Sequence, residues 1–197
     1  PLTNRHQVYG VFVNRKTGAG NYIFGDETVA LTGDKEASTE FCGMRFLLGP
    51  ASFVQVNPWT ATLIYERVLA VAQLLPPSRV AWDLFGGVGI IALLLAKAGL
   101  HTVSVESNAQ AVRLGRRNAL VLGLDASATF VEHDLRQGVP AHLPLPDLVV
   151  VNPPRTGLTT ALIKDLGVLS TPAKLIYVSC DARSLARDLA LLLDAGW

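Results

Sequence analysis

Apolar and polar positions follow two different patterns along the chain, and the change falls near Pro58. Before it, short alternating runs at 11–13 and 22–24 stand between closely spaced glycines, which is typical of β-hairpins. After it, stretches with helical spacing alternate with short apolar runs. The pattern predicts a small β-hairpin region followed by a larger α/β region.

Helices and strands alternate regularly in the second region. Chains of this kind form a parallel sheet that helices cover on both faces. The runs 148–151 and 175–178 are continuously apolar, as expected of strands that are buried on both faces. We predict strands at 80–84, 102–105, 129–131, 148–151 and 175–178, and helices at 60–75, 90–98, 109–122, 159–166 and 182–193.

Composition narrows the class of protein. Half of the residues are hydrophobic and 17% are charged, which argues against disorder. The most apolar stretch, 88–96, falls short of the about 18 residues that a membrane span needs, so we expect no membrane partner. The net charge of +1 allows an RNA partner without favouring one. Nothing in the sequence predicts an oligomeric state.

The two cysteines, Cys42 and Cys180, do not form a Cys-x-x-Cys pair, and we expect no metal site in this chain. Free thiols suit a reducing compartment and predict a cytoplasmic location. Because Pro1 is not an initiator residue, we expect the chain to begin inside a longer protein.

A glycine loop follows the first strand of the predicted sheet. In open parallel sheets, ligands bind at the carboxyl ends of the strands. The first strand leads into Asp83-Leu84-Phe85-Gly86-Gly87-Val88-Gly89, where the glycines let the backbone turn tightly against a ligand. The second strand ends in Glu106, whose carboxylate can accept both hydroxyls of a ribose, and the third leads to Asp134, placed for an adenine.

The same glycines also fit a dinucleotide fingerprint, Gly87-x-Gly89-x-x-Ala92. Asp83 argues against a dinucleotide, because its charge would repel a pyrophosphate but attract the cationic methionine end of S-adenosylmethionine. The motif Asn152-Pro153-Pro154-Arg155 at the end of the fourth strand is also unnecessary in dinucleotide folds. We therefore predict S-adenosylmethionine as the cofactor.

A proline-containing loop follows the fourth strand, and a cysteine follows the fifth. The prolines of Asn152-Pro153-Pro154 predict a rigid extended loop that can hold a flat base against the transferring methyl group. Cys180 follows the fifth strand and precedes a helix that Asp181 can cap. A cysteine at a helix N-terminus is a candidate thiolate, because unpaired backbone amides stabilise negative charge there.

Four motifs in this order resemble the RNA (uracil-C5)-methyltransferase family, whose members modify tRNA and ribosomal RNA. They are Ser52-Phe53-Val54-Gln55-Val56-Asn57, the segment 83–89, Asn152-Pro153-Pro154-Arg155-x-Gly157-Leu158, and Tyr177-Val178-Ser179-Cys180-x-x-x-Ser184-Leu185-Ala186-Arg187-Asp188-Leu189.

The resemblance implies a Rossmann-like methyltransferase fold, S-adenosylmethionine as cofactor and an RNA substrate, tRNA or rRNA. It implies that Cys180 is the nucleophile that adds to C6 of uracil and so activates C5 for methylation. With the site predicted above, the expected cofactor-binding residues are Gln55, Asp83, Phe85, Gly87, Gly89, Glu106, Asp134 and Asn152. The expected substrate-binding residues are Asn152, Pro153 and Arg155.

Several positions depart from the family. Asn152 replaces the usual Asp, Ile90 replaces a polar residue, and Asp181-Ala182 replaces Asn-Pro after the cysteine. The expected proton-abstracting Glu and two further strands would lie beyond Trp197. The resemblance thus predicts residues 1–50 as the end of a central β domain and 51–197 as a methyltransferase domain truncated at its C-terminus.

Two other functions stay open. Asn152-Pro153-Pro154 is also typical of amino-group methyltransferases that act on nucleic-acid bases, in which case Cys180 would be structural. A paralogue that binds RNA without methylating it is the third alternative.

Overall fold

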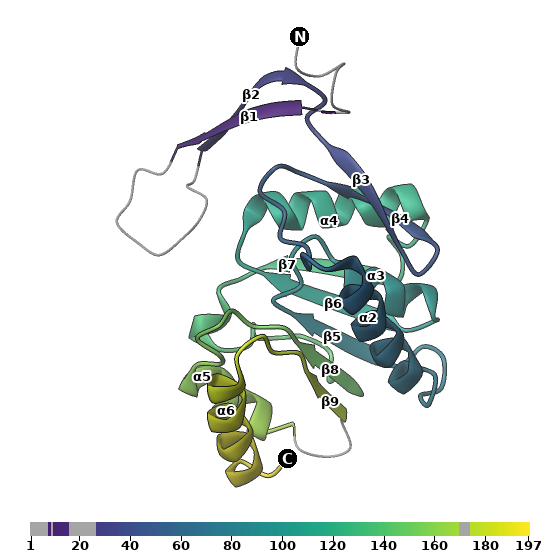
Figure 1. The fold of residues 1–197 in the computed structure, drawn as a ribbon. Helices are drawn as coiled ribbons and strands as arrows, with labels where there is room; N and C mark the ends of the chain where they lie inside the picture. The colour runs from purple at the N-terminus through teal and green to yellow at the C-terminus, as the bar shows by residue number, and fades with distance from the viewer. Residues whose placement is uncertain (1–7, 9, 16–26, 170–173) are drawn as a thin grey trace. The chain divides into compact units, whose positions relative to one another are not determined.

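The computed structural model describes residue 8 and residues 10–15, 27–169 and 174–197, and it divides the chain into two compact units (Figure 1). The first is Pro1–Val54 and the second is Gln55–Trp197. Each unit is described by itself below.

The first unit contains two antiparallel hairpins. Strand β1 (Gly10–Arg15) pairs with β2 (Glu27–Gly33), and β3 (Ala37–Phe41) pairs with β4 (Met44–Leu48). Cys42 and Gly43 form the turn of the second hairpin, both with positive φ, which is the conformation that a two-residue hairpin turn requires. The predicted run 11–13 lies in β1, whereas 22–24 falls outside the described residues.

The second unit is a parallel sheet in the order β7-β6-β5-β8-β9, flanked by helices (Figure 1). This confirms the predicted α/β, Rossmann-like fold class. The strands are β5 (Val80–Leu84), β6 (His101–Glu106), β7 (Ala128–Glu132), β8 (Leu148–Val151) and β9 (Lys174–Tyr177). The helices are α2 (Pro58–Ala72), α3 (Ile90–Lys97), α4 (Ala109–Leu122), the 3-10 helix η1 (Leu135–Gln137), α5 (Thr160–Gly167) and α6 (Ala182–Asp194).

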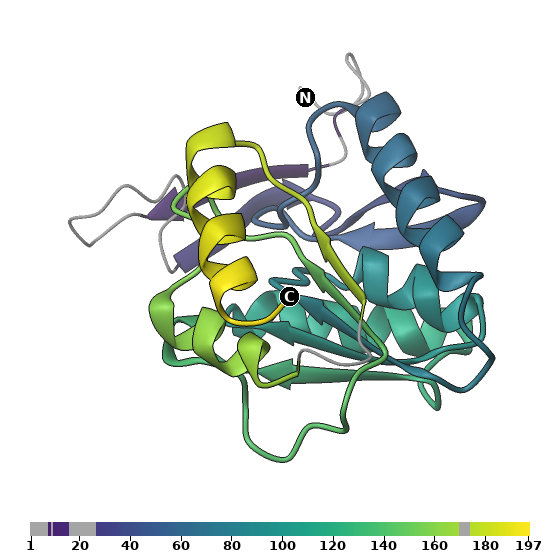
Figure 2. The same ribbon diagram turned by 90° about the horizontal axis from the view of Figure 1, so that it is seen from below.

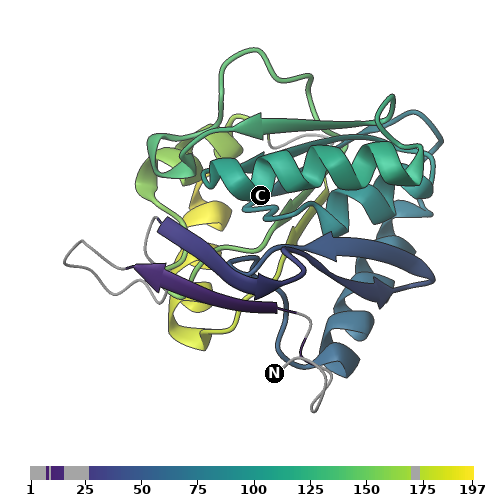
Figure 3. The same ribbon diagram turned by 90° about the horizontal axis from the view of Figure 1, so that it is seen from above.

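Side chains alternate between the two faces of this sheet. Trp82 and Leu84 of β5 belong to the core beneath α5 and α6, which lie side by side (Figure 2). Asp83 points to the other face, where α3 contacts β5 and β6 and α4 runs along β7 (Figure 3). Because the strands direct apolar side chains to both faces, helices pack on each face of the sheet.

The ring of Phe130 fills the space between the helices of that second face. A Cβ atom on Gly89 or on Gly115 would collide with the ring of Phe130. The missing side chains of the two glycines therefore let the start of α3 and the middle of α4 approach β7 closely.

The helix ends follow the predicted signals with one correction. Asn108 caps α4 by accepting from the amides of Gln110 and Ala111, and Gly123 ends it in the left-handed conformation. The helix predicted at 60–75 ends instead at Ala72. Beyond it, the amides of Leu74 and Leu75 donate to the carbonyl oxygens of Val71 and Ala72, three residues earlier, so the chain tightens into a turn before the prolines.

None of the described helices is long and apolar enough to cross a membrane. Within the described ranges, no three His, Cys, Asp or Glu side chains are grouped so that they could hold a metal ion.

Candidate functional site

The predicted site residues of the second unit lie mainly in the loops that follow its parallel strands. Such loops lie at one end of a parallel sheet. Loop 85–89 follows β5, Glu106 ends β6, and loop 133–138 follows β7. The segment 152–158 follows β8, and Cys180 follows β9.

The glycine loop after β5 is held by backbone bonds to β6. The amides of Phe85 and Gly86 both donate to the carbonyl oxygen of Val105, at 3.0 and 3.1 Å. Phe85, Gly87 and Gly89 all have positive φ. A Cβ atom on Gly87 would meet no other atom within 4 Å, so the backbone there faces open space into which a ligand can come.

Glu106 fixes this loop from the neighbouring strand. Its Oε2 accepts from the amide of Gly87 at 3.1 Å, and its Oε1 accepts from the amide of Asn108 at 2.8 Å. Oε1 also accepts from the hydroxyl of Ser107 at 3.1 Å, so the acceptor site that stays free is on Oε2. The half-buried Glu106 and the open side of Gly87 therefore fit a ribose and the chain attached to it.

Asp83 lies beneath the loop and is 1% exposed. Its Oδ2 accepts from the amide of Ala92 in α3 at 3.0 Å, while Oδ1 and the nearby Ser104 hydroxyl have no hydrogen-bond partner among the described residues. Burial, with a smaller contribution from the charge of Glu106, raises the pKa of Asp83 to about 7. In this structure Asp83 supports the start of α3, and its role toward a cofactor stays a prediction.

Asp134 begins η1 and is already paired. It accepts from the backbone amide of Arg136 at 3.0 Å, and the Arg136 guanidinium binds both of its oxygens at 2.7–3.0 Å. These bonds lower the pKa of Asp134. An adenine would thus meet an Asp134 carboxylate that Arg136 holds in place.

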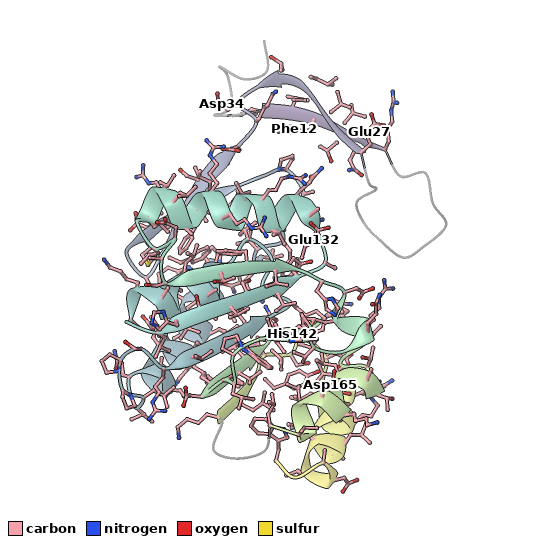
Figure 4. The ribbon with its side chains drawn as sticks, turned by 180° about the vertical axis from the view of Figure 1, so that it is seen from behind. Phe12, Glu27, Asp34, Glu132, His142 and Asp165 are labelled. Atoms are coloured by element: carbon pink, nitrogen blue, oxygen red, sulfur yellow. The ribbon has the colours of Figure 1, made fainter. Side chains whose placement is uncertain are left out.

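The rest of loop 133–138 is anchored from two sides. The ring of His133 lies 3.2 Å from the carbonyl oxygen of Gly138, and Asp165 of α5 accepts from the amide of Val139 at 2.8 Å. Figure 4 shows Asp165 on α5 and Glu132 at the end of β7, on the two sides of this loop. Gln55 opens the second unit two residues before Asn57, the cap of α2, and its role toward a cofactor stays a prediction.

The loop after β8 starts beside the glycine loop. The amide of Asn152 donates to the carbonyl oxygen of Leu84 at 3.2 Å, so Asn152 stands at the end of both strands. Pro153 is buried, whereas Pro154 and Arg155 are exposed. The amide of Gly157 donates to the carbonyl oxygen of Pro154 at 2.9 Å, which closes a tight turn that contains the exposed Arg155.

Cys180 is exposed and follows the end of β9. The amide of Val178 donates to the carbonyl oxygen of Val151 at 2.8 Å, which brings the two chain segments past β8 and β9 together. Asp181 caps α6 by accepting from the amides of Arg183 and Ser184, as predicted. The bond from the Ser184 amide, with a smaller contribution from the Arg155 charge, lowers the pKa of Asp181.

Sequence reasoning gave no role to Asp188 of α6, although the residue lies in the fourth motif. It is completely buried and accepts from the amide of Leu158 at 2.7 Å and from the hydroxyl of Tyr177 at 2.6 Å. Its signal in the sequence is its place on the buried stripe of α6, four residues after Ser184 and four before Leu192. An Asp at such a position needs internal partners.

Comparisons with known proteins agree with this geometry. The sequence profile of the methyltransferase small domain family matches residues 56–165. An RNA methyltransferase of Listeria innocua is 33% identical and matches 100% of this chain, and one of Synechocystis is 32% identical over 95% of it. The chain spans 43% and 40% of the length of these two relatives.

Among solved structures, the Pyrococcus abyssi tRNA (uracil-54, C5)-methyltransferase in complex with S-adenosyl-L-homocysteine superimposes with a TM-score of 0.75. It is 27% identical, and the match covers 98% of this chain and 46% of that one. Trm5b of the same organism shares the fold, with a TM-score of 0.67 at 18% identity. With more than half of its length matched by the family profile and with the predicted methyltransferase sheet in place, the chain belongs to the methyltransferase small domain family.

Proposed function

We propose that this chain is the catalytic part of an S-adenosylmethionine-dependent RNA methyltransferase that methylates uracil at C5. The observation that carries the proposal is the exposed Cys180, which stands beside the loop of Asn152, Pro153 and Arg155 at the ends of two adjacent strands. The similarity to a tRNA (uracil-54, C5)-methyltransferase over 98% of the chain supports it.

The cofactor would lie against the glycine loop. Glu106 would accept the ribose hydroxyls, Gly87 and Gly89 would let the backbone approach, and Phe85, Gln55, Asp134 and Asn152 would line the rest. Asp83 would act only through the loop and α3, because it is buried. When bound, S-adenosylmethionine supplies the methyl group that C5 takes up.

The chain's own residues would make C5 reactive. The Cys180 thiolate adds to C6, and the electron pair of the C5–C6 double bond moves onto C5 and the C4 carbonyl. C5 would then form its bond to the methyl group while the bond between that methyl and the cofactor sulfur breaks, and the electron pair of that bond would stay on the sulfur of the released S-adenosylhomocysteine. A base removes the C5 proton, and the returning electron pair breaks the C6–sulfur bond and frees the thiolate. We assign this base to no residue of 1–197 and propose that it lies outside this chain.

The loop after β8 would hold the target base. Asn152 would bind an edge of the uracil, buried Pro153 would stiffen the loop, and exposed Arg155 would contact the RNA backbone. The base must leave any stack or pair before it can reach Cys180.

The test is mass spectrometry of the nucleosides from RNA that has been treated with the intact protein and S-adenosylmethionine. We expect 5-methyluridine from the parent and from Cys42→Ala, the matched control at the other exposed cysteine, and none from Cys180→Ala. Unchanged turnover by Cys180→Ala would make this cysteine structural and overturn the uracil-C5 assignment.

Asn152→Asp separates uracil methylation from amino-group methylation. If Asn152 binds a uracil edge, the variant should keep or increase 5-methyluridine formation, because Asp also offers an acceptor oxygen. An amino-group methyltransferase should instead lose its N-methylated product, since the added charge disturbs the pairing with the substrate amine. An RNA-binding paralogue would give neither product from the parent.

A further inference from the structure

The residues around Asp188 form a network that joins three elements. Asp188 is 0% exposed, and its Oδ2 accepts from Leu158 in the loop after β8 and from the hydroxyl of Tyr177 in β9. Burial and the bond to Asp188 raise the pKa of Tyr177, so this hydroxyl stays a proton donor. Since Asp188 itself belongs to α6, one carboxylate contacts the strand before Cys180, the helix after it and the loop beside it.

Arg187 completes the network from the solvent side. Its Nε and Nη2 atoms donate to Oδ1 of Asp188 at 2.8 and 2.6 Å, and Nη2 also donates to the carbonyl oxygen of Thr156 at 2.7 Å. The guanidinium compensates the buried charge and adds a second bond to the loop after β8. Charge-assisted bonds of this kind are stronger than neutral ones.

The packing leaves no room for a side chain at the centre of the network. Gly157 has a φ of +77°, and a Cβ atom there would collide with Oδ2 of Asp188 and with Nη2 of Arg187. The Gly157-Leu158 pair of one motif and the Arg187-Asp188 pair of another are thus parts of one structure.

The network stands where the main-chain ladder ends. Val178 donates to Val151 beyond the paired strands, and from there the chain diverges into the loop that begins at Asn152 and the turn that carries Cys180. Asp188 reconnects the two segments, because it holds Leu158 in the first and sits on the helix that follows the second.

We propose that Asp188 is a positioning residue that locks the loop 152–158 to the turn of Cys180 and so sets where the target base stands relative to the thiolate. The inference rests on the proposed function for its catalytic meaning. Its structural content, that one carboxylate couples the two segments, can be tested without any reaction. Asp188 would not touch the reacting groups itself; it would act on them by holding the two segments in place.

The first test is amide hydrogen exchange in the intact protein. Asp188→Asn keeps the shape of the side chain but replaces one acceptor oxygen with an amino group. We expect exchange of the Leu158 amide to rise at least about 10-fold, together with faster exchange in 178–181. Asp194→Asn, at the exposed end of α6, is the matched control and should change neither segment. If Asp188→Asn leaves both segments as protected as in the parent, the coupling does not exist.

The second test measures catalysis. We expect kcat of Asp188→Asn to fall about 10- to 100-fold, because small misplacements of reacting groups slow a reaction this much. Affinity for S-adenosylmethionine, measured by calorimetry, should change less than about 2-fold, because Asp188 bonds to the far end of the loop, at Leu158, and makes no bond to the glycine loop or to Asn152. Equal loss of kcat and of cofactor affinity would show general unfolding and overturn the positioning role.

Tyr177→Phe is the variant to test if Asp188→Asn does not fold. It removes one hydroxyl from Asp188 and keeps the ring in the core. We expect a smaller loss in kcat, about 3- to 10-fold, with unchanged cofactor affinity and faster exchange at Leu158. A fully active Tyr177→Phe with parental exchange rates would contradict the network. If the parent itself forms no 5-methyluridine, the proposed function fails, while the exchange data still decide whether Asp188 couples the two segments.

Discussion

Two aspartates are buried near the carboxyl ends of the strands, and their surroundings differ completely. Asp83 on the cofactor side accepts one hydrogen bond and leaves Oδ1 unpaired among the described residues. Asp188 on the cysteine side accepts bonds at both oxygens and has Arg187 as counter-charge. Burial alone therefore does not say what a carboxylate does.

The difference suggests two ways of shaping a site. On the cofactor side, Glu106 and backbone amides hold the glycine loop. The buried charge of Asp83 lowers the stability of the folded state, and protonation of Asp83 removes this penalty. On the cysteine side, we propose that Asp188 holds the segments together through the bonds that it accepts at both oxygens. Replacing each aspartate with its neutral isostere should therefore have opposite consequences.

The largest expected effect is on the free energy of unfolding at pH 8. Asp188→Asn should destabilise the protein by about 3–5 kcal/mol, because several hydrogen bonds to a buried charged acceptor are weakened or lost together. Asp83→Asn should leave the stability unchanged or raise it, because it removes a buried unpaired charge. Urea denaturation of both variants measures this, and equal losses would abolish the distinction between the two sites.

The next effect is the pH dependence that Asp83 imposes. Its folded pKa of about 7 lies above the usual 3.8, so the folded state holds the proton that the unfolded state has released. Its contribution to stability is complete below pH 4 and is lost as the pH rises to 7, by about 2–4 kcal/mol. The stability of the parent relative to Asp83→Asn should therefore fall across this range and level off above it. A flat difference would mean that Asp83 titrates normally.

Two glycine substitutions sharpen the contrast in packing. Gly87 and Gly157 both have positive φ, but only Gly157 faces side chains. Gly87→Ala should cost about 1–2 kcal/mol from backbone strain alone, whereas Gly157→Ala should cost about 2 kcal/mol more because it displaces the Asp188 network. Thermal unfolding of the pair tests this, and similar losses would show that the loop at Gly157 moves freely.

The smallest expected effect concerns the cofactor. Glu106→Ala should weaken the binding of S-adenosylmethionine by about 1–2 kcal/mol, because ribose hydroxyls lose their acceptor and the Gly87 amide loses its partner. Calorimetry on the variant and on Asp188→Asn, which should bind like the parent, separates the two sides of the site. Tighter binding of a nicotinamide dinucleotide by the parent would contradict the cofactor assignment.

The main features of the fold could be predicted because local signals and periodicity agree. Asn108, Gly123 and Asp181 mark helix ends through their own hydrogen-bonding chemistry, and the apolar run 148–151 is a strand that is buried on both faces. What could not be predicted depends on contacts between distant segments. The sequence shows an acid at Asp83, but only the structure shows that it points into α3. The role of Asp188 was missed because two of its partners, Leu158 and Tyr177, come from distant parts of the chain.

Phe130 restricts how this region of the protein can evolve. Its ring occupies the space that side chains at Gly89 and Gly115 would need, although the three residues belong to different elements. A larger residue at Gly115 becomes acceptable only after position 130 has become smaller, and at Gly89 the positive φ would have to change as well. The order of substitutions therefore matters, and two lineages that differ at these sites should not tolerate an exchange of one residue at a time.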